Sequence, residues 1–192
     1  MTVIVGAVTK KDGVVLASDS VIEHSIVKTN DYDGKIWSNG EYVLGGAGEL
    51  RALQVVKYFF NVPEFRALKS ESIEEFLVKE VIPPLKEVLR EHEVLLTNKK
   101  TVYASLNLII GWDKHVCLIE EDFSIFVPKT KKVATGSGVA QSLGSLDNKS
   151  NNKWTKKDVI NAVKSAELTA PGVGGSIYTI STKDLKVTKF RG

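Results

Sequence analysis

The chain of 192 residues is long enough for one domain with a substantial hydrophobic core. Its hydrophobic content of 43% and charged content of 26% are ordinary for a soluble globular protein. The net charge of +3 is small and the lysines are spread along the sequence, which argues against nucleic-acid binding.

The first part of the chain is predicted to form two β-hairpins. Residues 2–8 and 13–17 are short runs rich in β-branched side chains, and an Asp-Gly turn lies between them. Residues 35–38 and 41–45 form a second pair around an Asn-Gly turn. Because no helical segment separates these strands, we expect antiparallel pairing.

The middle part is predicted to be helical. Residues 49–60 carry apolar side chains at helical spacing. A second helix over residues 72–89 begins at Ser72, with Glu75 three residues later, which is the pattern of a capping box. Pro83 and the proline after it predict a kink or a brief interruption of this helix.

The last part alternates strands and helices. A helix is predicted over residues 138–146, a polar loop over 147–153, and a further helix capped by Thr155. The predicted strands are residues 102–111, 115–120, 123–126, 132–135, 176–181 and 186–190. Together these elements favour one domain, residues 1–192, with two packed antiparallel sheets and helices on both outer faces.

Thr2 is the first candidate for a catalytic residue. A methionine followed by a small residue is normally excised, which would leave threonine at the mature N-terminus. Its hydroxyl then lies beside its own α-amino group, whose ordinary pKa is about 8, so one residue supplies both nucleophile and base. Very many proteins begin Met-Thr without using it chemically, so Thr2 alone decides nothing.

Five segments in chain order resemble proteasome β subunits and bacterial HslV, and they span essentially the whole chain. They are the Thr2 strand, a second strand ending in Ala17-Ser18-Asp19, Gly34-Lys35-Ile36, Val43-Leu44-Gly45-Gly46-Ala47-Gly48, and Thr135-Gly136-Ser137-Gly138. The resemblance implies the α+β fold of N-terminal-nucleophile (Ntn) hydrolases. That fold is a four-layer αββα sandwich, with two antiparallel sheets between helix layers.

The resemblance also implies a role for each matching side chain. Lys35 would lower the pKa of the Thr2 hydroxyl, and Asp19 would hold Lys35 charged and oriented. Ser137 would hydrogen-bond the α-amino group or the catalytic water. Each residue also has a plainer interpretation: a solvated lysine, an aspartate that caps a strand, and a Gly-Ser-Gly turn selected for backbone freedom.

Two further positions are implied by the same segments. Gly45 matches the residue whose backbone N–H helps to form the family's oxyanion hole, although such glycines also serve simply to turn a strand into a helix. Val43 matches a position at the base of the substrate pocket, which would favour an apolar substrate side chain.

The sequence departs from the proteasome pattern before its last strands. Proteasome β subunits carry an aspartate and a serine there that support the terminal amine, but alignment on Gly174-Gly175 puts Ala170 and Val173 at those positions. Glu167 could substitute as the acid. The missing pair puts the efficiency of amine activation in doubt more than the fold.

HslV is the better model for this segment, because Ser176-Ile177-Tyr178-Thr179 resembles its cation-binding turn and strand. The resemblance implies that backbone carbonyls of Val173, Ser176 and Thr179 bind a monovalent or divalent cation. No cofactor is required for the chemistry.

The sequence gives little support for a metal site, a nucleotide-hydrolysis site, secretion or membrane insertion. The three histidines have no metal-binding spacing, and no Walker motif supplies ATP hydrolysis. The single cysteine, Cys117, excludes an internal disulfide and lies in an apolar run typical of a buried, inert thiol. Without a secretory signal or an apolar run that could span a bilayer, a cytoplasmic protein is expected.

The resemblance predicts a threonine-type endopeptidase of a self-compartmentalising protease that acts on unfolded polypeptide. It implies stacked hexameric or heptameric rings and an AAA+ unfoldase ring as partner. Two alternatives remain open at this point: a non-catalytic ring subunit of the same fold, and an Ntn amidohydrolase that acts on small amides.

Overall fold

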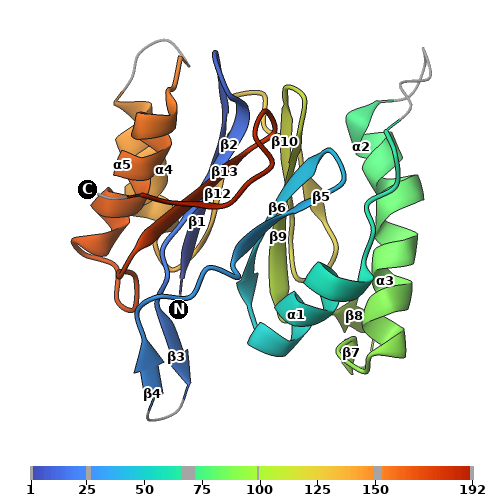
Figure 1. The fold of residues 1–192 in the computed structure, drawn as a ribbon. Helices are drawn as coiled ribbons and strands as arrows, with labels where there is room; N and C mark the ends of the chain where they lie inside the picture. The colour runs from blue at the N-terminus through green and yellow to red at the C-terminus, as the bar shows by residue number, and fades with distance from the viewer. Residues whose placement is uncertain (1, 25–26, 66–71, 99, 149–152, 191–192) are drawn as a thin grey trace.

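The protein is a four-layer sandwich in which two five-stranded antiparallel sheets pack face to face and helices cover both outer faces (Figure 1). The computed structural model describes residues 2–24, 27–65, 72–98, 100–148 and 153–190. This arrangement is the αββα fold that the sequence predicted. No helix in the described ranges is long and apolar enough to cross a membrane.

The first sheet contains both ends of the chain. Its strands, in spatial order, are β12 (Lys132–Gly136), β1 (Val3–Thr9), β2 (Gly13–Ser18), β13 (Ile177–Ser181) and β14 (Thr188–Phe190). Two antiparallel helices, α4 (Val139–Asp147) and α5 (Lys156–Glu167), cover its outer face. Thr155 caps α5 as predicted, through a complete capping box with Asp158.

The second sheet carries the larger helical layer. Its strands, in spatial order, are β11 (Ile125–Phe126), β10 (His115–Ile119), β9 (Leu106–Trp112), β6 (Tyr42–Gly48) and β5 (Ile36–Asn39). Its helices are α1 (Leu50–Phe59), α2 (Ile73–Phe76), the π-helical turn η1 (Leu77–Val81) and α3 (Ile82–Glu91).

The core strands are apolar on both faces because each sheet is covered twice. Along β1, Val3 and Val5 pack toward α5, whereas Ile4 packs between the sheets against Leu16 and Ile36. The register of β1 with β2 pairs Ile4 with Ser18 and so places the residues before β1 beside those after β2. The site described below lies at that end of the sandwich.

The predicted interruption of the second helix is the π-helical turn that precedes Pro83. Proline has no N–H to donate to the carbonyl four residues back, and its ring clashes with that carbonyl. The helix widens instead: the Ile82 N–H donates to the Leu77 carbonyl, five residues back. At the start of this helix the Ser72 hydroxyl accepts from the Glu75 N–H, while the Glu75 carboxylate pairs with Lys79.

Some predicted boundaries were wrong. The strand expected over residues 102–111 is two strands, β8 (Thr101–Tyr103) and β9, and β8 pairs in a separate hairpin with β7 (Leu96–Asn98). The strand expected from Phe123 begins at Ile125, because Phe123 has a positive φ of 69° and belongs to a tight turn. Part of the expected loop, residues 149–152, lies outside the described residues.

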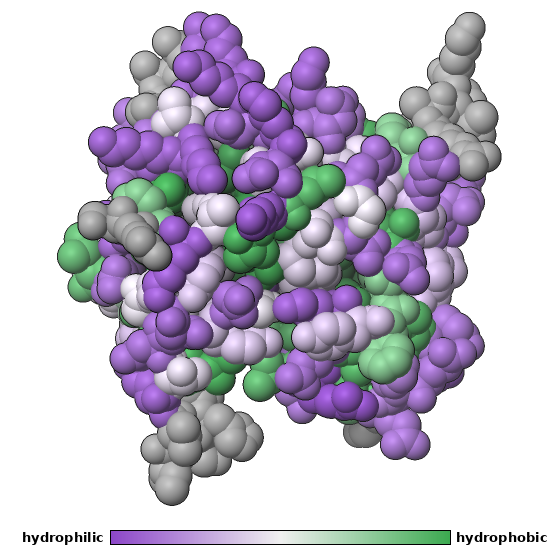
Figure 2. Space-filling model, in the orientation of Figure 1, coloured by the Kyte–Doolittle hydropathy of each residue, from purple (hydrophilic) through white to green (hydrophobic). Residues whose placement is uncertain are grey.

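One hairpin was not predicted. Strands β3 (Ile22–His24) and β4 (Val27–Thr29) pair with each other and project from the end of the sandwich where the described chain begins (Figure 1). Figure 2 shows a largely hydrophilic surface on this side of the molecule, with hydrophobic residues near the middle of the view.

Candidate functional site

Three of the predicted catalytic side chains meet at one carboxylate oxygen. Thr2 immediately precedes β1, Asp19 follows β2, and Lys35 precedes β5, which belongs to the other sheet. The Thr2 hydroxyl donates to Asp19 Oδ1 at 2.7 Å, and Lys35 Nζ donates to the same oxygen at 2.8 Å. The hydroxyl and the ammonium therefore share one acceptor at the junction of the two sheets.

Three backbone N–H groups also bind the Asp19 carboxylate. Its Oδ1 also accepts from the Val3 N–H at 2.9 Å. Its Oδ2 accepts from the Val21 N–H at 3.2 Å and the Gly174 N–H at 3.4 Å. Its side chain is fully buried, so these donors replace the water that the charge has lost.

Lys35 is a buried cation whose surroundings favour proton exchange. Its side chain is only 4% exposed, and Nζ donates to Asp19 and, at 2.7 Å, to the Val21 carbonyl. Burial lowers the pKa of Lys35 below its ordinary value, and the Asp19 charge opposes that shift without cancelling it. A lysine with a lowered pKa gives up its proton more readily than a solvated one.

Ser137 anchors the backbone of Thr2. Its N–H donates to the Thr2 carbonyl at 2.8 Å, and its hydroxyl donates to the same carbonyl at 3.2 Å and to the Pro171 carbonyl at 3.4 Å. Ser137 is thus adjacent to Thr2, as expected, although here its hydroxyl contacts the carbonyl. Gly136, with φ of 92°, lies against that carbonyl so closely that a side chain would overlap it.

Gly45 lies inside β6 and faces away from this cluster. A Cβ at Gly45 would meet Ile4 and Ile36 between the sheets, and Val43 is fully buried in the same core layer. Gly46, Ala47 and Gly48, the residues that follow, line the cavity beside Thr2. The role of Gly45 as an oxyanion donor remains a prediction.

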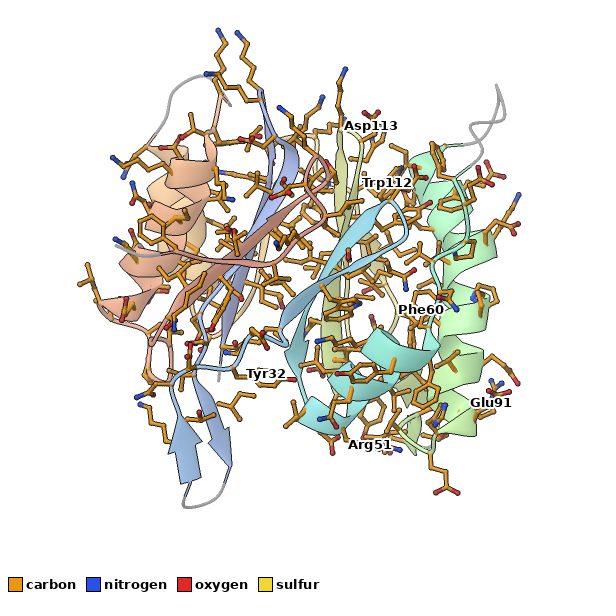
Figure 3. The ribbon with its side chains drawn as sticks, in the orientation of Figure 1. Tyr32, Arg51, Phe60, Glu91, Trp112 and Asp113 are labelled. Atoms are coloured by element: carbon orange, nitrogen blue, oxygen red, sulfur yellow. The ribbon has the colours of Figure 1, made fainter. Side chains whose placement is uncertain are left out.

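A cavity of about 440 Å³ opens beside Thr2, a size that suits a peptide side chain and its flanking backbone. Lys35 and Ser137 reach it with Thr2, and its polar lining includes Tyr32, Glu49 and Asn107. Figure 3 shows Tyr32 at the same end of the molecule as Arg51 at the start of α1, with Trp112 and Asp113 at the opposite end. The apolar lining of the cavity is formed by Val21, Ile22, Ala47, Leu50 and Leu53.

The residues of the predicted cation site lie at the start of β13. Ser176 is bound into the turn by its N–H, which donates to the Ser20 hydroxyl at 2.7 Å. Thr179 lies within the strand, paired with Ala17 and Thr188, and its carbonyl accepts from the Thr188 hydroxyl at 3.4 Å. That carbonyl is already engaged and fits a cation less well than the turn around Val173. The site therefore remains a prediction.

The position that matches the proteasome aspartate carries no acidic side chain. Ala170 is buried, and its side chain has no polar atom. The nearest alternative is Glu167, whose carboxylate lies over Gly174, the residue that donates to Asp19. Among the described residues, no group of three histidine, cysteine, aspartate or glutamate side chains could hold a metal ion. Cys117 is fully buried, and burial raises its pKa to about 12.

Several residues of this site were not found from the sequence. Val21 and Gly174 bind Asp19 through their backbones, which any residue type could do, so no sequence signal marks them. Ser20 connects three segments: its hydroxyl donates to the Asn30 carbonyl, accepts from the Ser176 N–H, and its own N–H donates to the Gly174 carbonyl. The sequence signal that could have marked Ser20 was its place in the run Ala17-Ser18-Asp19-Ser20, directly after the predicted catalytic aspartate.

Solved structures share this architecture across the full chain. The structure of BPH from Thiobacillus denitrificans in complex with epoxomicin matches with a TM-score of 0.72 at 17% identity, covering 100% of both chains. A second structure of BPH from the same organism gives a TM-score of 0.74 at 17% identity, covering 99% of both chains. Anbu, an ancestral β-subunit from Yersinia bercovieri, gives 0.67 at 16% identity, covering 98% of this chain and 86% of its own.

Sequence comparison adds no closer relative. No protein-family model matches the chain, and no curated protein matches it. At these identities the structural matches establish the fold. They show that BPH and Anbu share its arrangement of two antiparallel sheets between helix layers.

Proposed function

We propose that the chain is a threonine-type endopeptidase whose nucleophile is Thr2 after removal of Met1. The observation that carries the proposal is the convergence of the Thr2 hydroxyl and the Lys35 ammonium on Asp19 Oδ1 beside a cavity. A purely structural threonine needs neither a buried lysine nor a substrate-sized cavity. The neighbour BPH, which binds epoxomicin, adds support from the same fold.

In the proposed reaction, the α-amine freed at Thr2 takes the proton of the Thr2 hydroxyl, directly or through a water molecule. The oxygen attacks the carbonyl carbon of a peptide bond in the cavity and forms a tetrahedral intermediate. The amine then gives its proton to the leaving nitrogen, the C–N bond breaks, and an ester on Thr2 remains. Water, activated by the same amine, hydrolyses the ester and frees Thr2.

Lys35 contributes positive charge where the Thr2 oxygen becomes negative, and Asp19 keeps both donors in place. Backbone N–H groups along the end of β6 supply the oxyanion site, with Gly45 as the candidate from sequence and Ala47 and Gly48 as residues that line the cavity. The Gly46 N–H is not available for this role, because it donates to the Lys35 carbonyl at 3.0 Å and so ties this segment to the lysine.

The proposal is tested by modification of the chain end. Mass spectrometry of the purified protein should show a chain that begins at Thr2, and incubation with epoxomicin should add the mass of one epoxomicin molecule to the N-terminal peptide. Hydrolysis of casein or fluorogenic peptides should fall by at least about 10³-fold in Thr2→Ala, while the oligomeric state persists. Unchanged turnover in Thr2→Ala would reject Thr2 as the nucleophile.

The two alternatives give different results in the same experiments. A non-catalytic subunit of this fold would either retain Met1, and so have no free Thr2 amine, or have a poorly activated Thr2 amine; in both cases it would take up no epoxomicin. A small-amide hydrolase would cleave short amides in preference to casein and fluorogenic peptides. Neither alternative has a specific structural observation in its favour.

The assembly is part of the proposal. We propose stacked hexameric or heptameric rings with the sites facing an internal chamber, an AAA+ unfoldase ring that supplies unfolded polypeptide, and a cytoplasmic location. A monovalent or divalent cation at Val173, Ser176 and Thr179 would brace the turn beside Asp19. Mass photometry of the purified protein gives the number of subunits, and a monomer would contradict the ring.

A further inference from the structure

The start of helix α1 brings an acidic residue to the cavity beside Thr2. Glu49 is the residue before α1, it is exposed, and it is one of the residues that line the cavity. It makes no capping hydrogen bond to the helix. In the described part of the chain no lysine or arginine forms a salt bridge with it, so its charge is available to a ligand.

The charges that line the cavity do not cancel. Among the described residues that line the cavity, Lys35 is the one lysine or arginine, and its charge is already matched by Asp19. Glu49 is the one acidic residue in that same described lining. Arg51, the nearest cation on α1, is not a lining residue, and positions two apart on a helix face in different directions.

We propose that this cavity selects a substrate side chain with a cationic head, lysine or arginine, and that Glu49 is the residue that recognises it. This inference rests on the proposed peptidase function and names its substrate class: polypeptides cleaved next to a basic residue. A charged hydrogen bond to an ionised carboxylate is among the stronger polar contacts available, and it is directional.

The rest of the cavity suits the same side chains. Lysine and arginine carry three or four methylene groups that pack on apolar surface while the charged end stays among polar groups. Leu50, Leu53 and Ala47 provide an apolar wall, and the Asn107 amide and the Tyr32 hydroxyl provide further polar atoms. A glutamate or aspartate side chain would instead meet the negative charge of Glu49.

The apolar preference expected from the sequence depended on Val43. That residue is fully buried in the layer between the sheets and does not line the cavity. The cavity is lined instead by residues 46–50, where the chain leaves β6 and enters α1. Specificity is therefore assigned to Glu49 in place of Val43.

The test is a set of fluorogenic peptides that differ only in the residue before the cleaved bond: arginine, lysine, leucine or glutamate. We expect kcat/KM to be at least about tenfold higher for arginine and lysine than for leucine, and lowest for glutamate. Glu49→Gln should lower kcat/KM about tenfold for the basic peptides and leave the leucine peptide within about twofold. Glu49→Lys should favour the glutamate peptide.

The matched control is Glu41→Gln, which removes the same charge from the exposed turn between β5 and β6, outside the cavity lining. It should leave the order of preference unchanged, and thermal unfolding should show all variants folded. If peptides are cleaved with the same preference before and after Glu49→Gln, the role of Glu49 is overturned while the peptidase function stands. If no peptide is cleaved and epoxomicin does not modify Thr2, both proposals fall.

Discussion

This protein has a buried ion pair at the candidate site and an exposed ion pair on helix α3, and the two differ in how far solvent reaches them. The side chains of Lys35 and Asp19 are 4% and 1% exposed, whereas those of Arg90 and Glu87 on α3 are 61% and 58% exposed. Both pairs join a cation to a carboxylate, so charge alone does not distinguish them. What differs is the water that each pair has lost.

Removing two charges from water costs several kcal/mol per ion, and an apolar pair of similar volume is often as stable. A fold maintains a pair like Lys35–Asp19 only if backbone donors share the cost, as Val3, Val21 and Gly174 do here. The exposed pair on α3 has no such cost and little gain. The comparison teaches that the buried pair marks the site, while the exposed pair is part of an ordinary solvated helix.

The largest effect should come from breaking the buried pair on one side. Lys35→Met leaves the Asp19 charge buried without its cation and should lower the free energy of unfolding by about 3–5 kcal/mol, with loss of peptide hydrolysis. Urea unfolding measures the first and a fluorogenic peptide the second. The double variant Asp19→Asn/Lys35→Met should recover part of the stability but no activity. A loss in the double variant equal to the sum of the losses in Lys35→Met and Asp19→Asn would show that the pair is not coupled.

A smaller loss should follow from crowding the Thr2 backbone. Gly136 has φ of 92°, and a Cβ there would overlap the Thr2 carbonyl, so Gly136→Ala should destabilise by about 2–3 kcal/mol and reduce turnover. Gly40 is the matched control. Its φ of 58° is also positive, but no atom lies near its Cβ position, so Gly40→Ala should cost about 1 kcal/mol and leave turnover unchanged. Equal losses would show that Gly136 matters only for its backbone angle.

Lowering the pH should test how much the exposed carboxylate of Asp31, next to the site, contributes to stability. Asp31 accepts from Lys189 Nζ at 2.8 Å and from the Tyr178 hydroxyl at 2.6 Å. The Lys189 contact first, and then that of Tyr178, lower the pKa of Asp31 from 3.8 to about 2. A carboxyl whose pKa falls on folding stabilises the protein above pH 3.8, and that contribution disappears as pH falls through about 2.

Asp31→Asn should therefore lower the urea midpoint at neutral pH, and the difference from wild type should shrink as the pH approaches 2. Asp184→Asn, which removes the same charge from an exposed turn before β14, is the matched control. A constant difference across this range would mean that Asp31 acts through packing and not through its charge.

The smallest effect is expected on the exposed pair. Glu87→Gln should change the free energy of unfolding by less than about 0.5 kcal/mol. Solvent screens the Arg90–Glu87 interaction, and both side chains regain rotational freedom when the pair is removed. Peptide hydrolysis should be unaffected. A loss above about 1 kcal/mol would contradict the distinction between the two kinds of pair.

Much of the fold was accessible from local patterns. Both predicted hairpins formed as expected around their Asp-Gly and Asn-Gly turns. The turn glycines, Gly13 and Gly40, both have positive φ. The β3–β4 hairpin was missed because its strands are short and pair only with each other. The break between β8 and β9 was missed because the sequence is apolar across it, while the chain turns at Ala104, whose N–H donates to the distant Glu121 carbonyl.

The candidate site divides along the same line. Thr2, Asp19, Lys35 and Ser137 belong to recognisable segments, and the structure brings their side chains or backbones together. Gly45 and Val43 belong to an equally recognisable segment, yet both face the layer between the sheets. A one-residue step along a strand reverses the face of every side chain, so pattern alone could not say which residues of β6 reach the cavity.

The sequence by itself determined which residue types were available and where strands and helices would form, because backbone preferences and apolar periodicity act over a few neighbouring residues. Only the tertiary structure decided that the Thr2 hydroxyl and the Lys35 ammonium donate to the same oxygen atom of Asp19, and that Glu49 rather than Val43 lines the cavity. Those outcomes depend on how the two sheets align and on where β6 gives way to α1, and each is set by packing between segments far apart in the chain.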